Sequence, residues 1–173
     1  MSFIQYVICF LISMVPIIEL RGAIPYGIAM IPKNSPNMVL EIILVFVICI
    51  VGNMLPVPLI YFFARKVLLW GKDKKVIGKF FTFCLQKGEK GGQKLQKKSG
   101  KGLFVALMLF VGIPIPGTGA WTGTLAASFL NMGFKKSVIA VICGVLIAGS
   151  IMAVGTIGVK AGLGGVFSLL ANS

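Results

Sequence analysis

The residues of this chain best suited to chemistry are an acid and a base two positions apart. Glu19 and Arg21 stand between apolar runs in the segment PIIELRGAIPYGIAM, residues 16–30. A carboxylate in apolar surroundings can bind and release a proton, and the planar guanidinium of an arginine matches a phosphate or another anion. Ionisable groups at membrane depth are costly, so the pair predicts a substrate or proton site. A structural ion pair that fixes the local fold is the alternative.

A second stretch, PIPGTGAWTGT at residues 114–124, offers hydroxyl groups and the backbone amides of a glycine-rich turn. Such amides can bind an anion, but small residues also permit close helix packing without any ligand. Asn53, in the stretch GNMLPVP, either lines a pathway or satisfies hydrogen bonds of neighbouring backbone. The candidate substrate and proton site comprises Glu19, Arg21, Asn53, Thr118 and Thr122.

Several classes of chemistry are excluded by what the sequence lacks. The chain has no histidine, and its four cysteines are scattered without a CxxC pair. Histidine-based catalysis and most zinc sites therefore have no candidate residues. We also find no nucleophile with a neighbouring base, so we predict that the protein is not an enzyme and uses no metal or other cofactor.

Composition assigns the chain to integral membrane proteins. Hydrophobic residues make up 57% of its 173 residues and charged residues only 12%, against about a quarter in soluble domains. We predict two transmembrane helices, at residues 37–64 and 134–158, the second followed by an apolar C-terminal tail. The first would be roughly 40 Å long, enough to cross a bilayer with some tilt.

The net charge of +13 is concentrated in one loop, since residues 65–101 hold 12 of the 17 Lys and Arg residues. In a chain this apolar, such a loop indicates the cytoplasmic side of a multi-pass protein of the plasma membrane rather than nucleic-acid binding. Apolar residues at helical spacing among the lysines predict an interfacial helix at 74–86 that contacts anionic lipid headgroups. A solvated loop is the alternative.

The apolar segments contain a weak repeat. Residues 113–127 resemble residues 15–29, and each stretch is followed by a polar break and then a long apolar helix. At a constant offset the identities are Pro16/Pro114, Ile17/Ile115 and Ala29/Ala127. Glycine- and proline-interrupted segments at corresponding places in two halves are typical of an inverted-topology repeat around a transport site. The predicted repeats are residues 1–64 and 102–173, with the basic loop between them.

The interrupted segments are too short to cross a membrane, so we predict two re-entrant helical hairpins, at residues 1–31 and 102–131. Their prolines and glycines are expected to break the helices at the hairpin tips: Pro16, Gly22, Pro25, Pro114, Pro116, Gly117 and Gly119. This topology places Lys33 and Lys160 on the face opposite the basic loop, and Lys135 on the same side as that loop.

The motifs ELRGAIP and GNMLPVP in the first half and GIPIPGTGAWTG in the second resemble the putative small multidrug export protein family. That family is similar to the DedA/VTT superfamily of lipid-phosphate transporters and scramblases. The resemblance implies two opposed re-entrant hairpins around a central site, with Glu19 and Arg21 at the charged hairpin positions. The sequence departs from the superfamily pattern at 117–119, where Gly-Thr-Gly stands without an arginine.

From these features we predict a small membrane transporter, proton-coupled through Glu19 and active as a homo-oligomer. Its substrate would be a small amphipathic molecule, either a lipid-linked phosphate or an exported drug-like compound. The alternative is a membrane scaffold that transports nothing and binds anionic lipid headgroups through the basic loop.

Overall fold

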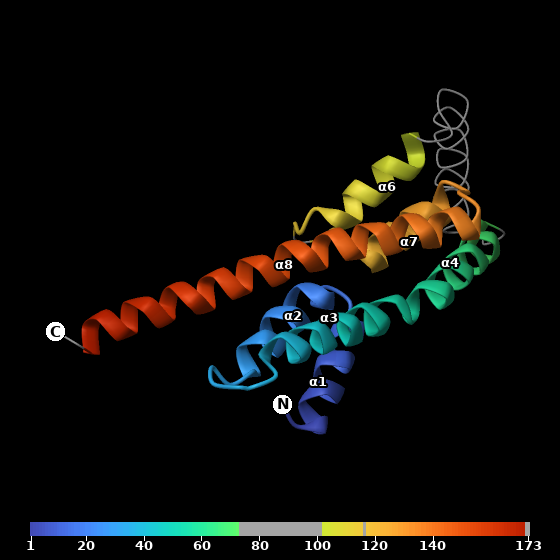
Figure 1. The fold of residues 1–173 in the computed structure, drawn as a ribbon. Helices are drawn as coiled ribbons and strands as arrows, with labels where there is room; N and C mark the ends of the chain where they lie inside the picture. The colour runs from blue at the N-terminus through green and yellow to red at the C-terminus, as the bar shows by residue number, and fades with distance from the viewer. Residues whose placement is uncertain (73–101, 116, 172–173) are drawn as a thin grey trace. The chain divides into compact units, whose positions relative to one another are not determined.

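The computed structural model describes residues 1–72, 102–115 and 117–171. Within these ranges the chain forms α-helices and turns and contains no strand, which confirms the all-α prediction. The interfacial helix predicted at 74–86 and the tip residue Pro116 lie outside the described residues. The helices are α1 (Phe3–Met14), α2 (Glu19–Met30), α3 (Met38–Met54), α4 (Pro56–Lys72), α6 (Gly102–Gly112), α7 (Ala120–Phe129) and α8 (Phe134–Ala171) (Figure 1).

The helices belong to two compact units. Unit 1 consists of Met1–Asn53 and Ile147–Ser173, and unit 2 consists of Met54–Leu146. Each unit contains one pair of short helices, α1 with α2 and α6 with α7, and α8 contributes residues to both units. These units differ from the predicted repeats because the long helical segments after each short pair are divided between the two units.

Among the described residues, two helical stretches have the length and apolarity of membrane spans, Met38–Phe63 with 26 residues and Phe134–Gly162 with 29. At 1.5 Å per residue they are roughly 39 and 44 Å long. They agree with the predicted spans at 37–64 and 134–158, and α8 continues to Ala171. The first span is interrupted between α3 and α4, because the proline at the start of α4 has no N–H to donate and its ring clashes with the preceding turn.

The segment that carries Glu19 is helical, which corrects the prediction that Gly22 and Pro25 lie at a non-helical tip. Both residues lie inside α2. The chain turns instead at residues 15–18, where Ile17 has φ 80°, and Glu19 has φ 50°. A proline inside a helix removes a single backbone hydrogen bond, and membrane helices tolerate such a break. The reversal therefore comes from left-handed residues just before and at the first residue of α2.

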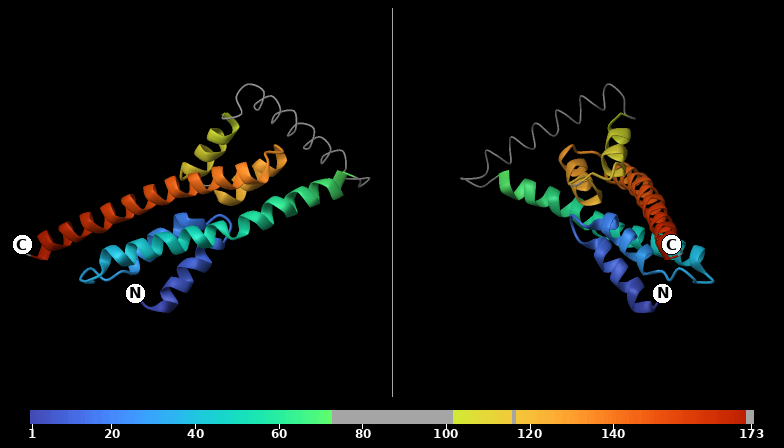
Figure 2. Two further views of the ribbon diagram at one scale, coloured as in Figure 1. Left: turned by 45° about the vertical axis from the view of Figure 1, so that its right-hand side comes forward. Right: turned by 90° about the vertical axis from the view of Figure 1, so that its left-hand side faces the viewer.

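Unit 1 is packed through glycines. A Cβ atom on Gly27 of α2 would lie 2.5 Å from Val45 Cγ1 of α3 and 3.0 Å from Cys9 Sγ of α1. A Cβ atom on Gly52 of α3 would lie 2.1 Å from Ser13 Oγ. The distances of 2.5 and 2.1 Å are shorter than those that real Cβ atoms show, so the glycines let α1, α2 and α3 approach closely. Both views in Figure 2 show α1 and α2 side by side.

Unit 2 is packed in a similar way. A Cβ atom on Gly123 of α7 would lie 2.4 Å from Val111 Cγ2 of α6, and one on Gly144 of α8 would lie 2.6 Å from Val111 Cβ. The Gly144 position also faces the backbone oxygen of Met108, at 2.7 Å. Since a backbone atom cannot move aside as a side chain can, the close contact between α6 and α8 leaves room only for glycine at position 144.

The glycines of α8 differ in their surroundings. Gly144 and Gly149 meet neighbouring helices, but no described atom lies within 4 Å of a Cβ atom built on Gly155 or Gly158. Helical spacing alone cannot show which part of a long helix has neighbours.

This difference gives a test within one helix. Gly144→Ala is expected to destabilise the protein by about 1–3 kcal/mol, because the added methyl group overlaps backbone and side chain of α6. Gly155→Ala is the matched control and is expected to leave stability unchanged or slightly raised, because alanine favours helix more than glycine does. Melting temperatures in detergent measure both. Equal losses in the two variants would contradict the packing of α6 on α8.

Candidate functional site

Glu19 is a buried carboxylate at the start of α2. Its residue is 4% exposed, and its backbone N–H donates to the carbonyl oxygen of Val15 at 3.0 Å across the hairpin turn. No other Asp, Glu, Lys or Arg whose side-chain exposure is described is buried to this degree. No group of three or more His, Cys, Asp or Glu side chains in the described ranges could hold a metal ion. The site therefore offers one ionisable carboxyl group for a proton or a cation.

Arg21 lies in the same helical turn and is half-buried. Glu19 is close enough for its charge to act on the guanidinium group. The Arg21 side chain is more exposed than that of the buried Glu19. The structure thus brings the two predicted charges together but gives them different environments, one inside unit 1 and one nearer its surface.

Asn53 is a fully buried side chain at the end of α3, with 0% exposure. Neither its amide nitrogen nor its amide oxygen has a hydrogen-bond partner within the described part of the chain. Leaving buried polar atoms unpaired costs on the order of 1–3 kcal/mol. The neighbouring Gly52 packs against Ser13, six residues before Glu19, so Asn53 lies at the level of the hairpin turn. Repair of neighbouring backbone, one of its two predicted roles, finds no support among these residues.

Thr118 and Thr122 belong to unit 2, and their predicted role in a site with Glu19 stays a prediction. The hydroxyl of Thr118 lies 2.9 Å from the carbonyl oxygens of both Ile113 and Ile115 and closes the second turn. Thr122 is exposed. In this turn, unlike the first, the positive φ angles fall on predicted tip glycines, with 87° at Gly117 and 152° at Gly119. Thr118 therefore has a structural role that the sequence did not indicate.

The sequence did not predict the hydrogen bonds at the ends of α2 and α7, the second or return helix of each short pair. In unit 2 the Tyr61 hydroxyl donates to the carbonyl oxygen of Met132 at 2.6 Å, and the Ser128 hydroxyl donates to the carbonyl oxygen of Tyr61 at 3.1 Å. In unit 1 the Lys160 ammonium donates to the carbonyl oxygen of Ile28 at 2.8 Å. Buried polar side chains in apolar helices need partners, which was the available signal.

The family model described as "Putative small multi-drug export protein" matches residues 19–151, which is more than half of the chain and begins at Glu19. Neither the curated proteins nor the solved structures gave a match. The predicted relation to the DedA/VTT superfamily stays a prediction.

The unpaired amide of Asn53 leads to a stability test. Asn53→Leu is expected to keep or raise the melting temperature in detergent, because an apolar side chain of similar size removes the unpaired polar atoms. Tyr61→Phe is the control for a buried polar group that is paired, and it is expected to cost about 1 kcal/mol by losing the bond to Met132. A clear loss of stability in Asn53→Leu would mean that the amide has partners, and would remove it from the site.

Proposed function

Because the chain belongs to the family of small multi-drug export proteins, we propose that it is a membrane transporter that moves a small amphipathic substrate across the cytoplasmic membrane. The observation that carries the proposal is Glu19, a buried acid at the turn of a pair of helices too short to cross a bilayer. Burying an ionisable carboxyl group costs free energy, and a protein with a purely structural role gains nothing from that cost.

The lengths of the short helices support re-entrant hairpins. The four helices α1, α2, α6 and α7 have 10–12 residues each, which gives roughly 15–18 Å against about 30 Å of hydrocarbon. In unit 1 both ends of the hairpin lie at the start of α3. The α-amino group of Met1 donates to Glu41 in the first turn of α3, and α2 joins α3 through residues 31–37. A hairpin whose ends meet in this way would enter and leave on one side.

Burial patterns support the proposed repeat. The buried residues Cys9 and Ser13 of α1 have counterparts 98 positions later in Leu107 and Val111 of α6. The second helices of the hairpins, α2 and α7, match at an offset of 100 residues. Their buried pairs are Leu20/Ala120, Ala23/Gly123, Ile24/Thr124, Gly27/Ala127 and Ile28/Ser128. The second turn is thus two residues longer. The offset of 98 therefore fails for Ala29, which is exposed, whereas Ala127 is buried.

The long helix after each hairpin provides a second correspondence. Gly52 of α3 faces the side chain of Ser13 and the backbone oxygen of Phe10, three residues earlier. Gly144 of α8 faces Val111 and the backbone oxygen of Met108, again three residues earlier. Two hairpins that each dock on the following helix through one glycine are what an inverted repeat would produce.

The proposed mechanism is proton-coupled alternating access. Glu19 binds a proton on one side of the membrane and releases it on the other, and Arg21 holds an anionic group of the substrate or acts as counter-ion to Glu19. Arg21 favours a lipid-linked phosphate, and an ionised Glu19 favours a cationic drug-like compound. Two hairpins and two spans enclose little space, so we also propose a homo-oligomer in the plasma membrane with the loop 65–101 in the cytoplasm.

Glu19→Gln in proteoliposomes tests the coupling. The probes are ethidium, as a lipophilic cation, and a fluorescent short-chain phosphatidic acid, as a lipid phosphate. We expect a pH gradient to drive movement of one probe, and Glu19→Gln to reduce this flux by about tenfold or more because the amide cannot titrate. Dye quenching inside the vesicles measures the rate.

Glu41→Gln is the matched control for this experiment, since Glu41 is an acid of the same unit at the start of α3. It is expected to retain most of the flux. If neither probe moves in the wild type while vesicles of anionic lipid still bind the protein through the basic loop 65–101, the scaffold function replaces transport. A flux that Glu19→Gln leaves unchanged contradicts the proposed role of Glu19.

Cysteine labelling tests the membrane topology. In a background without the four native cysteines, Lys33→Cys and Lys135→Cys are expected to react with a membrane-impermeant maleimide from opposite sides, because one span separates them if both hairpins are re-entrant. Right-side-out and inverted vesicles give the two readouts. Labelling of both positions from one side would mean that a hairpin crosses the membrane fully, and would overturn the inverted repeat.

A further inference from the structure

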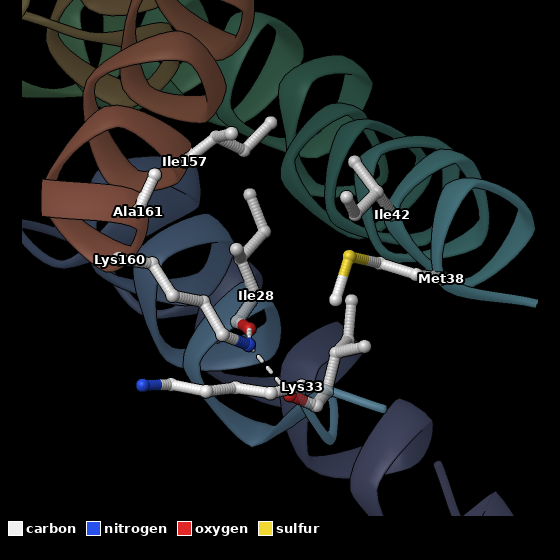
Figure 3. A pocket seen from close by; sticks show the side chains of 8 residues that line it. Ile28, Lys33, Met38, Ile42, Ile157, Lys160 and Ala161 are labelled. Carbon is white, nitrogen blue, oxygen red and sulfur yellow. Dashed lines mark hydrogen bonds between the residues drawn. The ribbon is translucent and has the colours of Figure 1, made fainter. Parts of the chain in front are cut away.

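Unit 1 contains a pocket of about 260 Å³ that is separate from Glu19 and Arg21. It lies where α2, the start of α3 and the far part of α8 come together. Its walls are Ile28, Ile31, Met38, Ile42, Ile157 and Ala161, with Lys33 and Lys160 as the lining residues that carry charge. Figure 3 shows Ile28, Ile42 and Ile157 around the pocket and the side chains of Lys33 and Lys160 along one edge of it.

The two lysines have different roles. Lys160 donates to the carbonyl oxygens of Ile28 and Ile31, at 2.8 and 2.5 Å, and so provides a hydrogen-bond partner for carbonyl groups at the C-terminal end of α2. An ammonium group has three N–H donors, so one remains beyond these two carbonyls. Lys33 is exposed and comes from the loop after α2. Capping of a helix explains Lys160 but gives no reason for Lys33 beside the same pocket.

The charges around this pocket do not cancel. Glu41, in the first turn of α3, acts on Lys160 electrostatically, but its carboxylate already pairs with the α-amino group of Met1. Lys33 and Lys160 together carry two positive charges against the single negative charge of Glu41. The pocket therefore combines apolar walls with an excess of positive charge on one side. The ligand that matches both properties is an amphipathic anion.

The pocket is smaller than the roughly 300–1,000 Å³ of sites that enclose a whole drug-sized ligand. It has room for part of a lipid. We infer that it binds one anionic phospholipid, with the phosphate between Lys33 and Lys160 and the first acyl methylenes against Ile28, Ile42 and Ile157. The lipid fixes the end of α2 to α3 and α8. This binding goes beyond the proposed transport, because it uses neither Glu19 nor Arg21 and stands if transport fails.

Native mass spectrometry of the full chain in detergent tests the inference, with phosphatidylglycerol and phosphatidylcholine of identical chains as probes. We expect one tightly bound phosphatidylglycerol, with about tenfold weaker binding of phosphatidylcholine. Lys33→Gln is expected to weaken phosphatidylglycerol binding by about tenfold, the effect of roughly 1.4 kcal/mol. Lys135→Gln, an exposed lysine of unit 2, is the matched control and should leave the affinity unchanged.

A second variant keeps the charges and fills the space. Ile157 is 41% exposed, so Ile157→Trp is expected to fold and to block the acyl chain while both lysines remain. Loss of the bound lipid in this variant and in Lys33→Gln supports the site, even if Lys160→Gln unfolds the end of α2. The lipid site would be overturned if the two lipids bound equally well, or if Lys135→Gln weakened binding as much as Lys33→Gln. It would also be overturned if inorganic phosphate displaced the lipid, or if a second copy of the chain bound in place of the lipid.

Discussion

The constraint on which this fold depends is that backbone polar groups need partners wherever water is absent. Short helices expose many unpaired groups for their length, because each end leaves four without an intrahelical bond. The structure supplies partners from distant parts of the chain. Lys160 caps α2 in unit 1, and Tyr61 bonds the carbonyl oxygen of Met132 after α7 in unit 2. The Thr118 hydroxyl does the same for the second turn. Each return helix is thus tied to a long helix at the end away from its turn.

Close helix packing is the second consequence of an apolar environment. Without a hydrophobic force between helices in lipid, association depends on contact at short range, which small residues permit. Gly52 and Gly144 fulfil this role in units 1 and 2, each facing a backbone oxygen of the first hairpin helix. Because the same arrangement occurs on both long helices, the hairpins share a local architecture even though few of their residues are identical.

The sequence predicted the features that composition determines. An uncharged apolar run long enough to cross a membrane has few alternatives, so both spans were found with boundaries close to those observed. It predicted the second helix of the first hairpin but not that α2 begins at Glu19 and includes Gly22 and Pro25, because proline and glycine are strong helix breakers in isolation. The contacts of Gly27 with α1 and α3 hold this helix in place. Glu19 and Arg21 stood out by type. The partners of Tyr61 and Lys160 lie about 70 and 130 residues away in the chain. A local sequence pattern carries no information about contacts over such a separation.

Helical structure around Glu19 changes how the proposed site would work. The N-terminus of a helix attracts negative charge, and Arg21 adds a full positive charge in the same turn. An ionised Glu19 and a bound anion would therefore compete for the same positive groups. A proton on Glu19 removes one competitor, so protonation and anion binding would favour each other, and the two would move together. A cationic substrate would need the opposite, an ionised Glu19 with Arg21 turned away.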